Sequence, residues 1–322
     1  MHLSGYEFNR EKLFLRFNGL NHKFMKKNFT KSNEDKEYLE KKYKLFELYQ
    51  DEFLFRSYYA YSILKRMRLL KETALKAQFE GLRSQFKITD EKEILYSSFM
   101  TREYIYFVMP FLNTIFILQD RIMTLLSEFL NIQDKYDKLP KYYYDYKKKI
   151  NKIFPLFPKP IQTLLINYWE KHGNFIRQYR NLDQHQYQLY YHSFYRLKPK
   201  EEYVLYLPDK ITRNMGLHEI TYKKKIIALD FFEKEFRAFH DFVENMLKQI
   251  KVQPYEIKPG SSFSPLERLV NYKNGDILST MIIGNEALIF RMSNENKPDS
   301  EAKSLTIQKV RNNITSFKWE FK

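Results

Sequence analysis

The residues best suited to chemistry lie between 174 and 192, and residues 177 to 187 read RQYRNLDQHQY. Histidine titrates near neutral pH, so His185 can take up or release a proton. Arg180 keeps its charge and can grip a phosphate through two parallel hydrogen bonds. Asn181 lies four residues before His185, where on a helix it can orient the imidazole or a substrate. Together these groups suit phosphodiester cleavage in RNA without a metal ion.

The spacing of these residues predicts that they belong to a helix with two faces. One face carries apolar residues and the other carries polar residues four, three and four apart, namely Asn181, His185, Gln188 and His192. A solvated face would be expected to carry Lys and Glu instead. Gly173-Asn174 predicts a break and a fresh helix start, whose N-terminus would favour a nearby anion. The alternative is a structural histidine on an ordinary helix.

Arg180-Asn181-x-x-x-His185 resembles the motif of the HEPN superfamily, in which Arg and a polar neighbour precede His by a short spacer. With Tyr187 the string also resembles the Arg-x4-His-x-Tyr form of HEPN toxins. The resemblance covers roughly residues 31 to 250. It implies that Arg180 and His185 are the catalytic pair, assisted by Asn181. Tyr187 would be the position that a nucleotidyltransferase-type antitoxin modifies. The expected RNA-binding or auxiliary residues are Arg177, Gln184, Tyr187 and His192.

The activity implied by this resemblance is metal-independent endoribonuclease cleavage that leaves a 2′,3′-cyclic phosphate, as in a toxin or an antiviral effector. The resemblance also implies a homodimer with a composite site. Helix geometry agrees, because positions five apart, such as Arg180 and His185, lie about 140° apart around one helix. The alternatives are a catalytically silent HEPN-like RNA-binding or scaffold protein, and a helical structural protein with no nucleic-acid role.

A second match to the motif runs from Arg213-Asn214 to His218. It contains Gly216, lies between strand-like segments and has Ile220 where the toxin form has Tyr. We therefore favour the first match.

The composition agrees with a nucleic-acid partner and excludes several kinds of site. The 322 residues carry a net charge of +16, which favours RNA or another acidic partner. The absence of cysteine excludes disulfides, thiol catalysis and Cys-ligated metals. We expect no metal site and no cofactor, since no phosphate-binding or dinucleotide-binding glycine loop is present.

No stretch of the sequence predicts a membrane protein. The longest apolar stretch, Tyr104 to Leu118, is shorter than the roughly 20 residues that a membrane span requires. Charge runs through the first twenty residues, so we expect no signal peptide and a cytoplasmic location.

The predicted fold class is mainly α: a HEPN-like helical bundle with an inserted β-hairpin and a small antiparallel β-rich C-terminal region. Residues 1–30 form an N-terminal arm, possibly a strand that enters a turn at Asn18-Gly19. The helical domain spans 31–250, and 251–322 hold a linker and strands. The predicted strands of this region are Ile277–Ile283, Glu286–Met292, Leu305–Val310 and Ile314–Phe321.

Within the helical domain we expect one long helix or two from Ser32, a second from about Thr89 to Ile132 and a third from Ile161 to about Leu197. Pro110 divides or kinks the second helix. A hairpin of Tyr203–Leu207 and Ile220–Leu229 precedes a last helix, Asp230–Ile250. The Tyr/Lys run 141–149 either contacts RNA or packs its tyrosines on the bundle, which we favour.

Overall fold

The structure is a computed structural model. It describes residues 10–29, 36–86, 93–94, 99–132, 143–148, 154–185, 189, 192–197, 201–209, 211, 217–255, 277–283, 286–294, 303–311 and 313–320. The chain divides into two compact units, Met1–Tyr255 and Glu256–Lys322. The first unit is mainly helical, and it holds every residue of the candidate site.

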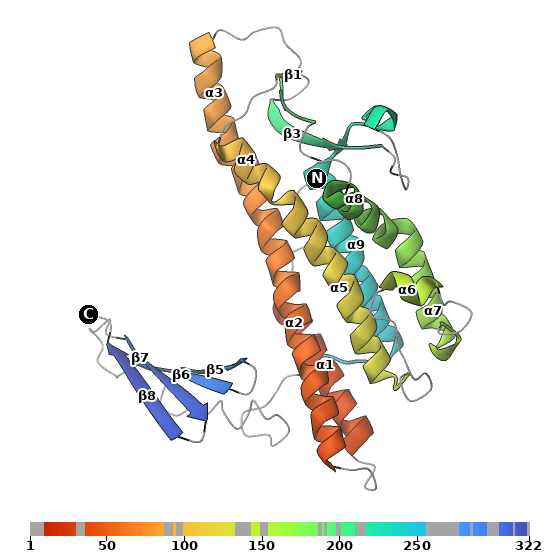
Figure 1. The fold of residues 1–322 in the computed structure, drawn as a ribbon, viewed down its shortest axis with the longest axis vertical. Helices are drawn as coiled ribbons and strands as arrows, with labels where there is room; N and C mark the ends of the chain where they lie inside the picture. Colours follow the sequence, from red (N-terminus) through yellow and green to blue (C-terminus); the bar gives the residue numbers. More distant parts are fainter. Residues whose placement is uncertain are drawn as a thin grey trace. The chain divides into compact units, whose positions relative to one another are not determined.

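Three long helices form the centre of the first unit and run alongside one another (Figure 1). They are α2 (Lys36–Leu69), α5 (Val108–Phe129) and α9 (Ala228–Gln249). Aromatic side chains fill the space between them: Phe111 of α5 stacks on Phe232 of α9, and Phe53 of α2 meets Phe239. The period of the apolar residues in α9 places one whole face in this core, which confirms the predicted last helix.

Two of the predicted helices are continued through a π-helical turn. The π turn Leu70–Ala74 joins α2 to α3 (Leu75–Phe86), and the π turn Trp169–Gly173 joins α7 (Lys159–Tyr168) to α8 (Asn174–His185). A break at Phe107 separates α4 (Phe99–Tyr106) from α5, three residues before Pro110. Proline has no N–H for the preceding turn, so the predicted division of this helix is confirmed. The short α6 (Tyr143–Lys148) and a 3-10 turn, Phe154–Leu156, precede α7.

A small antiparallel sheet with strand order β1-β2-β3-β4 belongs to the same unit. Its strands are β1 (Glu93–Ile94), β2 (Ser193–Arg196), β3 (Glu202–Leu207) and β4 (Ile226–Ile227). Phe194 is paired with Val204, and Tyr206 with Ile227. β3 contacts α3 and α9, so the sheet lies at one end of the bundle (Figure 1).

Three sequence expectations in this part of the unit are wrong. The third helix stops at His185, and residues up to Leu197 include strand β2. The second helix does not begin near Thr89, because Glu93–Ile94 form a strand. Of the strand expected at Ile220–Leu229, only Ile226–Ile227 are paired, and a 3-10 turn, Leu217–Glu219, precedes it. In the first two cases pairing between distant segments overrides the local pattern, and in the third the strand is cut short because α9 begins at Ala228.

The expectation of a strand-like arm at the N-terminus is wrong for Arg10–Phe29, which form helix α1. Phe17, Leu20 and Phe24 follow a helical period and are buried, which outweighs the short alternation of Leu13, Leu15 and Phe17. Gly19 is no turn residue. A Cβ at this position would lie 1.7 Å from the carbonyl oxygen of Gln253, so glycine permits the chain after α9 to cross α1 closely.

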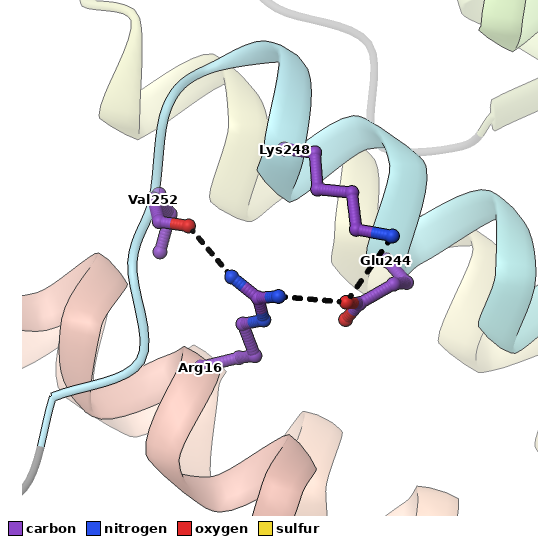
Figure 2. A network of polar contacts seen from close by, with 4 residues as sticks. All are labelled: Arg16, Glu244, Lys248 and Val252. Carbon is purple, nitrogen blue, oxygen red and sulfur yellow. Dashed lines mark hydrogen bonds and ion pairs between the residues drawn. The ribbon is translucent and has the colours of Figure 1, made fainter.

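Arg16 fastens α1 to the end of α9, as Figure 2 shows. Its guanidinium donates to the carbonyl oxygen of Val252 at 3.0 Å and to Glu244 at 2.9 Å, and Lys248 lies 3.6 Å from the same carboxylate. The backbone N–H of Tyr255 donates to the carbonyl oxygen of Leu15. Arg10–Phe29 and residues 251–255 therefore belong with the helical unit.

The second unit contains one antiparallel sheet of strand order β5-β6-β7-β8. Its strands are β5 (Ile277–Ile283), β6 (Glu286–Asn294), β7 (Lys303–Arg311) and β8 (Asn313–Glu320). Ile283 is paired with Glu286 and Arg311 with Asn313, so each of these connections is a tight hairpin. Among all described residues, no helix is both long enough and apolar enough to cross a membrane.

Candidate functional site

Helix α8 carries the candidate residues, and the π turn before it determines how they are presented. Gly173 was expected to break the helix, but a Cβ there would lie 3.1 Å from both Trp169 and Tyr168. Glycine therefore allows close packing while the helix continues. Asn174 has helical dihedral angles, and its N–H donates to the carbonyl oxygen of Trp169. The predicted N-cap and its anion-binding helix end are wrong, because no free helix N-terminus exists at this point.

The apolar face of α8 is packed into the unit by Ile176, Tyr179 and Leu182, all buried. The Tyr179 hydroxyl donates to the carbonyl oxygen of Pro208 at 2.7 Å. This bond ties the helix to the end of β3. Burial of this face fixes the rotation of α8 and directs Arg180 toward α5.

Arg180 is half-buried between α8 and α5 in a group of polar side chains that we call the Arg180 cluster: Asn113, Asp120, Arg180, Asn181 and Gln184. Nε of Arg180 donates to Oδ1 of Asn113 at 3.2 Å, and Nη1 donates to Oδ1 of Asn181 at 3.1 Å. Nε2 of Gln184 donates to the same oxygen of Asn113 at 3.3 Å. The structure thus joins Arg180 to Asn181 directly and to Gln184 through the shared oxygen of Asn113.

Sequence reasoning missed the part of the cluster that α5 contributes. Asn113, Phe116 and Asp120 lie three and four residues apart, so they share one face of α5. The guanidinium carbon of Arg180 lies 4.9 Å from the centre of the Phe116 ring. The sequence signal that could have revealed this face was the presence of Asn113 and Asp120 in an otherwise apolar helix. Polar groups that are buried in such a helix require hydrogen-bonding partners.

Asp120 is buried, and its environment changes its proton affinity. Burial raises the pKa of its carboxyl group to about 6, although the backbone N–H of Tyr143 donates to it at 2.8 Å and Arg121 and Arg180 favour its ionised form. Burial lowers the pKa of Arg180, and the charge of Asp120 opposes that effect. The cluster therefore combines Arg180, which stays positively charged, with Asp120, a carboxyl group whose pKa lies close to neutral pH.

Arg177 lies one turn before Arg180 and covers an aromatic ring. Its guanidinium carbon is 3.8 Å from the centre of the Tyr144 ring on α6. The neighbouring Tyr143 is fully buried, stacks on Trp169 and donates its hydroxyl to the carbonyl oxygen of Leu165. For Tyr143, the interpretation of the Tyr/Lys run as core packing is confirmed.

The polar stripe that was expected to run from Asn181 to His192 is wrong beyond His185. His185 is the last residue of α8, and its side chain lies outside the described part of the structure, as do Gln188 and the proposed modification site Tyr187. His192 stacks on Tyr222 with ring centres 3.8 Å apart, and its carbonyl oxygen accepts from Tyr206. His192 therefore belongs to the sheet, because the helix has ended before it.

The second motif is only partly described. His218 is exposed on the 3-10 turn before β4, whereas Arg213 and Asn214 lie outside the described residues. His240 is buried, its Nδ1–H donates to the carbonyl oxygen of Phe236, and burial lowers its pKa to about 4. His172 lies 3.0 Å from Glu235. No group of three metal-binding side chains gathers among the residues that the structure describes.

A cavity of about 730 Å³ opens beside the other flank of α8. Its wall combines the half-exposed ring of Phe175 and the amide of Gln178 with three exposed lysines, Lys171, Lys224 and Lys234. Carboxylates also line it. Asp209 accepts hydrogen bonds from Thr221 and two backbone N–H groups, Glu235 pairs with His172, and Asp230 is exposed.

Comparison with known proteins gives no match: no family model, no curated protein and no solved structure is significantly similar to this chain. The function must therefore be argued from the residues themselves. The members of the Arg180 cluster on α8 lie in its last two turns, and α8 ends at His185.

Proposed function

We propose that the protein is a HEPN-like endoribonuclease that cleaves RNA without a metal ion. The observation that supports it best is the anchoring of Arg180. The bonds to Asn113 and Asn181 use two of its five N–H donors and hold the guanidinium in place. The donors that remain suit bidentate binding of a phosphate. An anchored cation costs little reorganisation when a charge develops at the phosphate.

The reaction is a transesterification followed by release. The 2′-oxygen forms a bond to phosphorus while the bond to the 5′-oxygen breaks, and a 2′,3′-cyclic phosphate and a 5′-hydroxyl result. The 2′-hydroxyl loses a proton and the leaving 5′-oxygen gains one; His185 carries out one of these two transfers and water the other, a task for which a histidine side chain is suited. Arg180 stabilises the charge on the phosphate, and Asn181 orients Arg180 through its side-chain oxygen.

The arrangement of the elements is compatible with this proposal. A helical bundle places the motif on a late helix, α8, and one further long helix, α9, follows it. The β2-β3-β4 sheet is inserted between these two helices. Within the same proposal, the enzyme is a toxin or antiviral effector acting as a homodimer. Tyr187 is the residue that a nucleotidyltransferase-type antitoxin would modify.

The test is incubation of the purified protein with total RNA in EDTA. We expect cleavage to persist, to leave cyclic phosphate ends and to spare DNA, which lacks the 2′-hydroxyl. His185→Ala and Arg180→Ala should abolish cleavage, whereas His218→Ala, the matched control in the second motif, should not. Loss of all activity in EDTA with recovery in Mg²⁺ would contradict the mechanism. Loss of activity in His218→Ala alone would mean that the second motif is the working one.

A second candidate, an RNA-binding protein without catalysis, is favoured by one observation. Arg177 and Arg180 both lie against aromatic rings of neighbouring helices, a position that also suits a purely binding role. Salt-dependent RNA binding without cleavage, weakened in Arg177→Ala, would select this function.

A further inference from the structure

Helix α2 has two apolar faces, and only one of them is used by the bundle. The inner row, in which residues recur every seven positions, is at most 5% exposed and comprises Leu39, Phe46, Phe53, Ala60 and Met67. On the opposite side six large apolar side chains are between 41% and 70% exposed: Tyr38, Leu45, Leu48, Phe55, Tyr59 and Leu69. We call this second face the outer stripe. An apolar row of this length on the surface of a soluble unit marks an interaction site.

The outer stripe has the spacing of a coiled-coil seam. Its residues occupy two heptad series. One series is 38, 45, 52, 59 and 66, and the other is 41, 48, 55, 62 and 69. Taken together, successive positions of the two series are alternately three and four residues apart, as in a coiled coil. The remaining positions of the two series are polar, namely Lys41, Glu52, Ser62 and Arg66. A partner helix that packs along this seam must offer apolar groups at the same spacing and charges opposite to Lys41 and Glu52.

The pattern points to a second copy of α2, and we infer that two copies of the protein pair through the outer stripe in antiparallel orientation. In an antiparallel pair the residue numbers rise along one helix as they fall along the other. Each pair of facing residues therefore has the same sum of residue numbers, and one member of the pair comes from each heptad series. With a sum of 93, Leu45 meets Leu48 of the copy, Tyr38 meets Phe55 and Lys41 meets Glu52. Lys44 and Asp51, both exposed beside the stripe, are then neighbours as well.

Other alignments match less well. A shift by one heptad places Leu48 against Glu52, and a shift by two places Lys41 against Arg66. A parallel pair in register places Lys41 on Lys41 and Glu52 on Glu52, and like charges at a seam oppose association. The antiparallel alignment with a sum of 93 joins apolar with apolar at Tyr38–Phe55 and Leu45–Leu48, and it places Lys41 beside Glu52, whose carboxylate also binds Arg56 and Arg121.

The size of the contact suits a reversible dimer. Taking about 200 Å² for each fully exposed side chain, Tyr38, Leu45, Leu48 and Phe55 would bury on the order of 450 Å² of apolar surface per copy. A typical specific interface buries about 800 Å² per partner, including its polar rim, to which Lys41, Lys44 and other flanking residues would contribute. A lipid surface is a poorer occupant, because Asp51 and Glu52 stand in the middle of this stretch and Glu52 is held there by Arg56 and Arg121.

The absence of cysteine from the chain makes a clean cross-linking test possible. Tyr38→Cys and Phe55→Cys variants of the full-length protein are prepared separately, oxidised alone and then oxidised as a mixture. In the proposed alignment Tyr38 and Phe55 of different copies face each other, whereas identical residues lie about 25 Å apart along the axis. We therefore expect disulfide dimers from the mixture and none from either variant alone. A dimer from each variant alone would indicate a parallel pair and overturn the proposal.

Association itself is tested by sedimentation with matched variants. Phe55 and Tyr106 are both 70% exposed, but Tyr106 is on α4, outside the stripe. Phe55→Lys should halve the sedimenting mass and raise the dissociation constant roughly tenfold or more, whereas Tyr106→Lys should leave both unchanged. Unchanged circular dichroism in Phe55→Lys would show that folding is intact. Equal mass for wild type and Phe55→Lys, together with no cross-link in the cysteine mixture, would show that the stripe does not bind a second copy.

Discussion

Replacing Asp120 by Asn removes the buried charge of the Arg180 cluster and keeps its shape. Asp120 is 9% exposed, and its pKa is raised from 3.8 to about 6, chiefly by burial. The folded carboxyl group therefore holds its proton more tightly than the unfolded one. Protons are taken up on folding between about pH 4 and pH 6, so the free energy of unfolding falls as pH rises through this window.

The size of the effect follows from the shift. About two pKa units at 1.36 kcal/mol each give a cost of about 3 kcal/mol above pH 6, none of which applies below pH 4. Asn keeps an oxygen that accepts from the N–H of Tyr143 but adds a buried amide donor, which costs about 1 kcal/mol or more. This amide cost is the same at both pH values, so we expect Asp120→Asn to be more stabilising at pH 7.5 than at pH 4 by about 3 kcal/mol.

Urea unfolding followed by circular dichroism measures this difference at both pH values. Protein concentration must be fixed, since association changes apparent stability. Asp145→Asn on α6 is the matched comparison, because it leaves Asp120 in place and removes a neighbouring charge that helps to raise the pKa of Asp120. We expect its effect on the free energy of unfolding to change less with pH than the effect of Asp120→Asn. A pH-independent effect of Asp120→Asn would refute the conclusion that burial raises the pKa of Asp120.

Two further predictions concern single packing and polar contacts. Gly19→Ala should destabilise the folded protein by about 3 kcal/mol, because the new Cβ would meet the carbonyl oxygen of Gln253. Gly81→Ala on α3 should stabilise it by up to about 1 kcal/mol, because a Cβ there would lie in open space. Thermal unfolding of the two variants measures both effects. Asn113→Ala should lower the free energy of unfolding by about 1 to 2 kcal/mol. It should also lower the rate of RNA cleavage more than Gln184→Ala does, because Asn113 anchors Arg180, whereas Gln184 has no bond to Arg180. Equal cleavage rates in the two variants would contradict this role of Asn113.

The parts of the fold that sequence predicted best are those whose local pattern agrees with their packing. Helix α9 begins and ends within two residues of the expected positions, because one unbroken aromatic face is buried. Two glycines were misinterpreted for one physical reason. Gly19 and Gly173 both stand inside helices where a Cβ would be crowded, at Gly19 by the backbone of Gln253 and at Gly173 by the rings of Trp169 and Tyr168. Sequence alone does not distinguish a glycine that ends a helix from one that permits a close contact.

The candidate site was predictable on α8 and not beyond it. The spacing of Arg180 and Asn181 is a property of one helix, and Asn181 does accept a hydrogen bond from Arg180, whereas Gln184 is joined to Arg180 only through Asn113. Asn113 is far away in the sequence, and only the packing of α5 on α8 brings it to Arg180. His192 shows the opposite error. It continued the helical spacing, but pairing of β2 with β3 placed it on the sheet.

The two proposed interfaces together make a prediction about assembly. The outer stripe is on α2 and the motif is on α8, and α5 packs against both helices, so the interfaces would use different faces of one protomer. A chain with two distinct two-fold interfaces forms a closed tetramer or an open polymer rather than a dimer. We therefore expect wild-type protein to sediment above the dimer at high concentration, and Phe55→Lys to reduce it to a dimer that still cleaves RNA. Mixing inactive Arg180→Ala and His185→Ala in the Phe55→Lys background should then restore part of the activity, because the remaining interface is the one that joins the motifs. A Phe55→Lys monomer with full activity and no recovery on mixing would instead assign the whole site to one protomer and leave the outer stripe as the interface that dimerises the protein.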